Sequence, residues 1–152
     1  MFLDESLEFA DAVSVGTPNA STVNVGDVVD LGAVVRDIGN GRPLYFCVKV
    51  STAITSGGAA TVRFRLSSDS TSTPAVNGTQ SEHIITATVA VASLVAGYGV
   101  AVALPQTSPD YERYLGFQVE AVAAVALNGG TVDAFLTFDP PANWVSYADG
   151  VN

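Results

Sequence analysis

Apolar and polar residues alternate with a period of two along much of this chain, and no other feature constrains its fold as strongly. The alternation is clearest in four runs, at residues 44–51, 62–67, 112–121 and 132–139. Because successive side chains of a β-strand point to opposite faces of a sheet, these runs predict half-buried strands. In the last run the predicted core face holds Val132, Ala134, Leu136 and Phe138, and Phe135 falls on the opposite face.

Turn residues separate the predicted strands. Residue pairs that favour tight turns predict hairpins at Asn40-Gly41, Gly57-Gly58, Asn77-Gly78 and Asn128-Gly129. Residues 67–80 are rich in Ser and Thr and have little to bury, so we expect a long, mobile surface loop there. A second exposed connection is expected at 105–110.

Further strands are expected at 21–31, 84–95 and 100–104. No helical period is long enough to form a crossover between parallel strands, and β-branched residues are abundant. We therefore expect an all-β fold, an antiparallel jelly-roll-like β-sandwich of about eight strands with little helix. An immunoglobulin-like sandwich is the main rival, although the Cys and Trp spacing of antibody domains is absent.

The 152 residues fit a single domain. Within it we expect an N-terminal arm or edge strand at 1–20, the β-sandwich at 21–139 and an extended C-terminal tail at 140–152. The arm is either an extra strand of its own sandwich or a strand lent to another chain, and the sequence leaves both open.

Charge and hydropathy exclude several classes of function. The formal net charge of −9 argues against nucleic-acid binding, because phosphates would repel the protein. Asp4 and Glu5 stand where a signal peptide needs basic residues, so we expect the chain to begin in the cytoplasm. The uncharged segment 84–109 could span a bilayer by its length, but Gly97 and Gly99 divide it, and two buried strands are the preferred interpretation.

No group of residues in the sequence selects a reaction. His83 is the single histidine, and a position at a strand end explains it more simply than a catalytic or metal-binding role. Cys47 has no second thiol as a partner, which favours a structural role. Asp27 and Asp30 lack the spacing of a calcium loop. We therefore expect a protein that is not an enzyme and needs no metal or cofactor.

Candidates for contact with another protein occur near both ends of the chain. Leu3, Leu7 and Phe9 are large apolar residues in an acidic N-terminal segment. Trp144 and Tyr147 follow two prolines that keep the tail extended. The simplest interpretation of Trp144 is that it covers the chain's own core, and the alternatives are an anchor for a neighbouring protein or a platform for a sugar.

A series of short motifs runs along nearly the whole chain. They are residues 3–12, Val29-Asp30-Leu31-Gly32, residues 36–41 with Pro43-Leu44-Tyr45, Glu112-Arg113-Tyr114-Leu115 and Val132-Asp133-Ala134-Phe135-Leu136. In their order and spacing these motifs resemble the capsid cement (decoration) proteins of short-tailed bacteriophages. The likeness rests on that order, since each motif alone is a common strand or turn signature.

The resemblance implies a jelly-roll-like sandwich on the outer face of an icosahedral capsid, where it bridges subunits of the major capsid protein as a homodimer or homotrimer. Such a protein is made in the cytoplasm of the bacterial host and ends in the virion. The predicted contact residues are Phe2, Leu3, Leu7, Phe9, Arg36, Arg42, Trp144 and Tyr147. For the two arginines, which flank the Asn40-Gly41 turn, a solvated loop is the simpler alternative.

A carbohydrate- or receptor-binding sandwich is the alternative function. It predicts a row of exposed aromatic side chains formed by Tyr45, Tyr111, Tyr114, Trp144 and Tyr147. A hydrolase on the same fold is a third class, and it would need two carboxylic acids facing each other in a cleft.

Overall fold

The computed structural model describes residues 5–33, 38, 41–106 and 109–141. Its strands are β1 Glu8–Ser14, β2 Thr22–Asp30, β3 Tyr45–Ser56, β4 Thr61–Asp69, β5 Ser81–Ile85, β6 Val89–Ala90, β7 Gly99–Ala103, β8 Tyr114–Ala121 and β9 Leu127–Thr137. Two short 3-10 turns accompany them, η1 Glu5–Leu7 and η2 Val91–Ser93.

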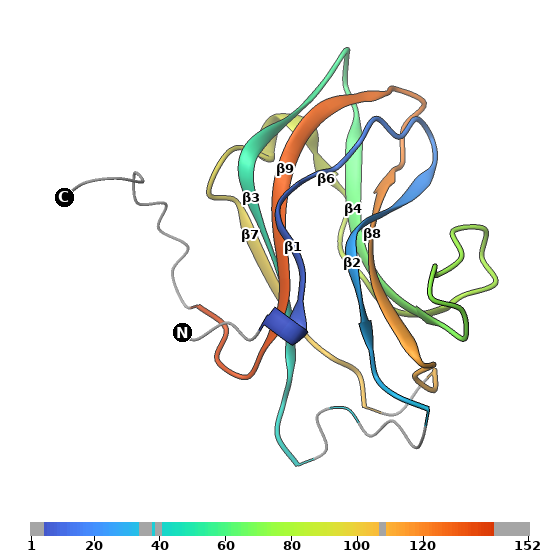
Figure 1. The fold of residues 1–152 in the computed structure, drawn as a ribbon. Helices are drawn as coiled ribbons and strands as arrows, with labels where there is room; N and C mark the ends of the chain where they lie inside the picture. The colour runs from blue at the N-terminus through green and yellow to red at the C-terminus, as the bar shows by residue number, and fades with distance from the viewer. Residues whose placement is uncertain (1–4, 34–37, 39–40, 107–108, 142–152) are drawn as a thin grey trace.

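The strands form two antiparallel sheets that pack face to face (Figure 1). The first sheet has the order β1-β9-β3-β7, and the second has the order β2-β8-β4-β5 with β6 paired to β4. These are the two sheet orders of a jelly roll, in which the chain winds back and forth between the layers. The predicted all-β, jelly-roll-like sandwich is therefore confirmed, with nine strands in the described residues.

The two ends of the sandwich differ in which strands begin there and which strands finish there. β1 and β3 begin at one end of the sandwich, and β2 and β9 finish there. We call this the lower end, because it is lower in Figure 1. The opposite end, where β3 and β8 end and β4 and β9 begin, is the upper end.

Four phenylalanines join the two sheets. Phe9 and Phe46 come from the first sheet, Phe64 and Phe117 from the second, and none is more than 1% exposed. The ring centroids of Phe46 and Phe117 lie 5.7 Å apart across the layers. Large aromatic rings in contact account for much of the apolar area buried in such a core.

The hairpin predicted at Gly57-Gly58 is wrong. These glycines join β3 to β4, which lie in different sheets, so the chain crosses there from one layer to the other. Asn77-Gly78 does lie in a hairpin, within the long loop between the paired strands β4 and β5, and Gly78 has a φ of 93°. Asn40 lies outside the described residues.

The hairpin predicted at Asn128-Gly129 is also wrong, because both residues lie inside β9. There β9 pairs with the last residues of β3, with Gly129 opposite Thr55. At Gly130 the φ is 123°, and a Cβ would lie 2.6 Å from the Cα of Ile54. The glycines therefore let the two backbones approach closely rather than making the chain turn.

The strand predicted at 84–95 is interrupted, which corrects the sequence interpretation. β5 ends at Ile85, β6 is short and η2 follows. The cause lies at Thr86, whose N–H donates to the carbonyl of Phe64 while its hydroxyl accepts the N–H of Phe64, 3.0 Å away. A side chain thus replaces one backbone bond of the ladder. In the described part of the chain, no helix has both the length and the apolar character to cross a membrane.

The loop 70–80 packs on the outer face of the second sheet, so the prediction that it has little to bury is wrong. Asn24 donates to the carbonyl of Pro74 at 2.8 Å, and Gln118 donates to that of Ala75 at the same distance. The Asp69 carboxylate accepts the N–H of Ala75 at 2.9 Å. This bond is the largest of several effects that hold the pKa of Asp69 below its usual value.

Candidate functional site

Three residues from distant parts of the sequence lie at the lower end of the first sheet. In the strand register Glu8 of β1 faces Phe135 of β9, and Tyr45 of β3 faces Thr137 of β9. Leu7, Arg42 and Phe138 lie one to three residues beyond these pairs. They therefore share one end of three neighbouring strands, although Leu7 and Phe138 are 131 residues apart by their numbers.

Arg42 and Phe138 are in contact at this end. The guanidinium carbon of Arg42 lies 5.1 Å from the centroid of the Phe138 ring, and Phe138 is 46% exposed. The alternation placed Phe138 in the core, which is wrong because β9 ends at Thr137 and the next residue has left the sheet. Cation–π contacts at exposed sites contribute about 0.5–1 kcal/mol. The pair presents a cation and an apolar ring together on the surface.

Phe9 does not offer a contact surface to a partner. Its side chain is 1% exposed and packs edge-on against Phe46, with 6.1 Å between the ring centroids. β1 pairs with β9 of the same chain, as an edge strand of its own sandwich. Phe9 therefore belongs to the core and leaves the set of predicted contact residues. Leu7 is partly buried against that core.

The other predicted contact residues fall outside the described part of the chain. They are Phe2, Leu3, Arg36, Trp144 and Tyr147. Four of them belong to the two terminal segments, which join the sandwich at its lower end next to η1 and after β9.

An acidic cleft of about 290 Å³ lies beside β1. Its lining includes the carboxylates of Glu5, Glu8, Asp11 and Asp27. Burial raises the pKa of Glu8, and the carboxylates of Asp11, Asp133 and Glu5 raise it further. In the described residues, no three His, Cys, Asp or Glu side chains gather in a way that could hold a metal ion.

Asp30 has an ion-pair partner in the structure. Its two carboxylate oxygens accept hydrogen bonds from Arg113 at 2.9 and 2.8 Å. This two-point contact joins the end of β2 to the residue before β8, which gives Asp30 a structural role at the lower end.

His83 and Ser68 form a part-buried polar pair at the lower end of the second sheet. The Ser68 hydroxyl lies 2.7 Å from His83 Nε2 and accepts the N–H of Glu112 at 2.8 Å. The imidazole stacks on Tyr111 with 3.9 Å between centroids, and burial lowers the pKa of His83 to about 4. Because Ser68 is 0% exposed, a substrate cannot reach its hydroxyl in this structure. The pair links β4 and β5 to the segment before β8.

Cys47 and Phe135 are paired neighbours on the outer face of the first sheet. Phe135 lies on the face that the alternation gives it, but it is buried at 2% exposure rather than solvated. Burial raises the pKa of the Cys47 thiol to about 11, so it is protonated near neutral pH.

The tyrosines expected in a sugar-binding row do not lie together. Tyr45 is on β3 in the first sheet, and Tyr114 is on β8 in the second. Tyr111 stacks on His83 and donates its hydroxyl to the carbonyl of Pro105 at 2.7 Å. Among the described residues the three tyrosines therefore form no common platform.

The fold and these surfaces define a small jelly-roll β-sandwich protein with an exposed cation–aromatic pair at one end. The model of the family described as Bbp16 matches residues 9–136, which run from β1 almost to the end of β9, and the chain belongs to this family. No curated protein matches the chain.

Proposed function

We propose that this protein is a cement protein of a bacteriophage, a structural part of the virion that sits on the outer face of the capsid and bridges subunits of the major capsid protein. The order of its motifs resembles that of cement proteins, and membership of the Bbp16 family is consistent with a phage-associated protein. The jelly-roll sandwich is the fold that the resemblance implies. The proposal gives the protein no catalytic role.

The observation that carries this proposal is that two of the predicted contact residues, Leu7 and Arg42, lie at the lower end together with the exposed ring of Phe138. Arg42 and Phe138 touch there, and Leu7 immediately precedes β1 of the same sheet. A surface assembled from such distant segments, with an exposed ring and a cation, has the composition of a protein-binding patch.

Charge agrees with a position outside the shell. A net charge of −9 would be repelled by packaged DNA but is tolerated on the outer face. A protein that contacts two capsid subunits must lose its contacts before those subunits separate, so many bound copies stabilise the shell together.

The test is binding to expanded, empty capsid shells, measured by cosedimentation. We expect Arg42→Ala and Phe138→Ala each to weaken binding about tenfold, because each removes half of the exposed pair. Arg63→Ala is the matched control, since Arg63 lies on β4 in the other sheet and pairs with Glu120 at 3.9 Å.

Equal binding by all three variants would show that the lower end is not the contact. Wild-type protein that fails to cosediment with any shell would contradict the cement role itself. Thermal melts of each variant establish that a loss of binding is not a loss of fold.

A further inference from the structure

β7 is an edge strand of the first sheet, and it lacks the usual protection of an edge against further pairing. Charged side chains and irregular pairing normally keep another strand away from the unpaired backbone groups of an edge. β7 contains no charged residue, whereas the edge strands β1, β2 and β5 each contain a carboxylate. Its five pairs with β3 have no register shift, whereas the pairing of β1, β2 and β5 is irregular.

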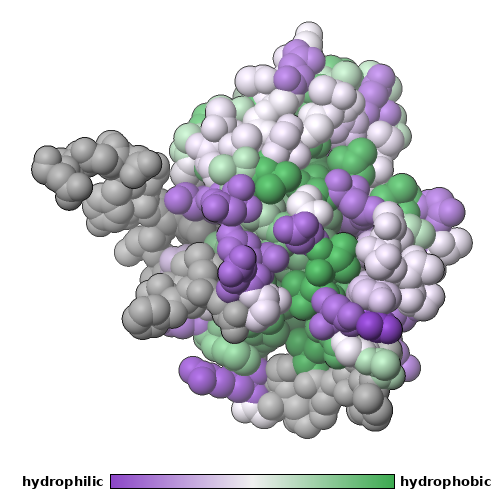
Figure 2. Space-filling view, viewed as in Figure 1, coloured by the Kyte–Doolittle hydropathy of each residue, from purple (hydrophilic) through white to green (hydrophobic). Residues whose placement is uncertain are grey.

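The opposite edge of the same sheet, β1, shows what such protection looks like. Glu8 and Asp11 lie on this strand, and the φ of Ala12 is 49°. In Figure 2, where β1 and β2 face the reader, strongly hydrophilic side chains lie among the apolar ones. An approaching strand would meet charge and a bent backbone there. Neither obstacle occurs within residues 99–103 of β7.

The open side of β7 presents a regular row of backbone groups. The N–H of Leu104 donates to the carbonyl of Leu44 at 2.8 Å, so these two residues form a hydrogen-bonded pair of the antiparallel ladder. In such a ladder, hydrogen-bonded pairs alternate with pairs whose backbone groups point away from each other. The even-numbered residues of β7 therefore bond to β3. The odd-numbered residues direct their N–H and C=O groups to the open side: Gly99, Ala101 and Ala103.

The side chains of β7 leave room for a further strand. On the outer face they are small, and the two alanines there are exposed. On the core face Val100 and Val102 pack against the core but stay partly exposed. Their neighbours on β3, Val48 and Phe46, are 0% exposed, because β3 has a strand on both sides. A strand beyond β7 would complete the burial of the two valines, which favours its binding.

The C-terminal residues 142–152 are in reach of this open side. Thr137 of β9 faces Tyr45 of β3, which faces Ala103 of β7, so these three strands are level at the lower end. Because neighbouring strands lie about 4.8 Å apart, a place beyond β7 is about 14 Å from β9. Residues 138–142 span about 17 Å when extended, so the segment that follows can begin at the lower end of β7.

The path and direction of the chain agree with this placement. Phe138 contacts Arg42, which lies in the connection that leads into β3, so the chain passes the start of β3 as it leaves β9. β7 is antiparallel to β3 and therefore runs from the upper end to the lower end. A segment that enters at the lower end and continues upward is antiparallel to β7.

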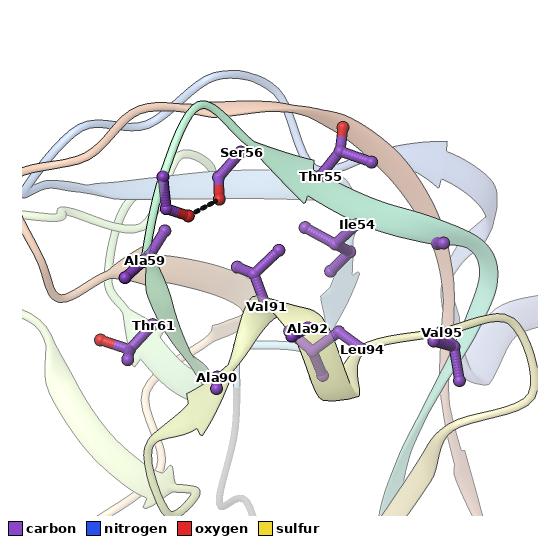
Figure 3. Close-up of a pocket in the computed structure, with 13 residues that line it drawn as sticks. Ile54, Thr55, Ser56, Ala59, Thr61, Ala90, Val91, Ala92, Leu94 and Val95 are labelled. Carbon is purple, nitrogen blue, oxygen red and sulfur yellow. Dashed lines mark hydrogen bonds between the residues drawn. The ribbon is translucent and has the colours of Figure 1, made fainter.

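Another apolar surface lies farther along the same path. A cleft of about 460 Å³ opens between the β3–β4 connection and η2, and Ile54 and Val91 point toward each other across it (Figure 3). The β3–β4 connection belongs to the upper end, whereas β9 finishes at the lower end. A segment that follows β9 therefore meets the open side of β7 first.

We propose that residues 142–152 pair with the open side of β7 as an additional antiparallel strand of the same molecule. Trp144, Val145 and Tyr147 are of residue types that are frequent in strands, and Asp149 is the single charged residue of the segment. The added strand closes the unprotected edge and keeps strands of other proteins from pairing there. Trp144 and Tyr147 then serve the protein's own sheet and not a contact with a capsid.

The first test is hydrogen exchange at the outward amides of β7, measured by NMR on the full chain. The amides of Ala101 and Ala103 should exchange at least about tenfold more slowly in the wild type than in the double variant Val145→Pro, Ser146→Pro. Adjacent N–H groups of a strand point to opposite sides, so one of the two prolines removes a pairing donor in either register. Val102 is the internal control, because its amide bonds to β3 and should stay protected in both proteins.

The second test uses Trp144, which is the single tryptophan of the chain. Ala101→Pro removes an outward N–H and leaves the bonds to β3 intact, as a proline on an edge strand can. It should shift the Trp144 emission to longer wavelength and increase its quenching by acrylamide. Ala101→Ser is the matched control, because it keeps the N–H and should retain the wild-type emission.

Equally fast exchange of Ala101 and Ala103 in both proteins would overturn the proposal, and so would an emission that Ala101→Pro leaves unchanged. A shielded Trp144 without protection of these amides would show that the segment binds elsewhere, for example in the cleft of Figure 3. Protection that depends on protein concentration would assign the added strand to a second copy and contradict pairing within one molecule. None of these measurements uses capsid shells, so failure of this proposal is distinct from failure of the cement function.

Discussion

Replacing Phe9 by alanine should destabilise the isolated protein by about 3 kcal/mol or more. The Phe9 ring is 1% exposed and packs edge-on against Phe46, so its removal leaves a cavity between two sheets that cannot collapse freely. Substitutions of this kind cost about 3–5 kcal/mol, a large part of the 5–15 kcal/mol that typically separates folded from unfolded domains. β1 is an edge strand, and its pairing with β9 has two irregularities. If β1 detaches while the rest of the sandwich stays folded, the loss of stability cannot exceed the free energy of that detachment.

The assay is urea unfolding of Phe9→Ala and of the wild type, followed by far-UV circular dichroism. Leu7→Ala is the control on the same segment, and its partly buried side chain should cost about 1 kcal/mol. A loss below about 1 kcal/mol for Phe9→Ala would contradict the burial of this ring in the core, because it would mean that β1 is not held in its own sandwich. If the loss instead depends on protein concentration, β1 is lent to another chain, the alternative that the sequence left open.

Three local features give further predictions. Burial lowers the pKa of His83 to about 4, so the unfolded chain binds a proton at this residue more readily than the folded protein does. The stability of the fold should therefore decrease as the pH is lowered from 6.5 to 4. His83→Gln should flatten that part of the pH profile of stability, and an unchanged profile would contradict the prediction. Gly130→Ala should lower stability by at least about 2 kcal/mol in thermal melts. The reason is that the φ of Gly130 is 123° and that a Cβ there would lie 2.6 Å from a backbone carbon of β3. A neutral effect would contradict this close approach of the two backbones. Asp69→Ala should speed hydrogen exchange at the Ala75 amide, whose 2.9 Å bond it removes, and unaltered protection would show that the loop is held otherwise.

The alternation of apolar and polar residues located much of the sandwich, because a strand with one face in the core carries an apolar residue at every second position. It placed β4 and β8 within two residues of their observed bounds. It failed where contacts distant in sequence decide the structure. Asn128-Gly129 is a turn signal locally, but β3 is longer than expected and continues the ladder there. Phe138 fits the period, yet the strand ends one residue earlier.

Only some residues of the candidate site, and nothing of its geometry, could be predicted from the sequence. Arg42 was selected from sequence, whereas its aromatic partner Phe138 was assigned to the core. The register joins residues up to 127 positions apart between β1 and β9 and up to 92 positions apart between β3 and β9, and no local pattern encodes it.

The thermal stability of capsid shells tests the proposal that this protein holds capsid subunits together. Expanded shells are heated with increasing amounts of the protein, and their disassembly is followed by light scattering. The proposed function predicts a disassembly temperature that rises until the binding sites are filled. About tenfold more Phe138→Ala protein should be needed for the same rise. Shells that bind the wild-type protein fully and still come apart at their original temperature would contradict it.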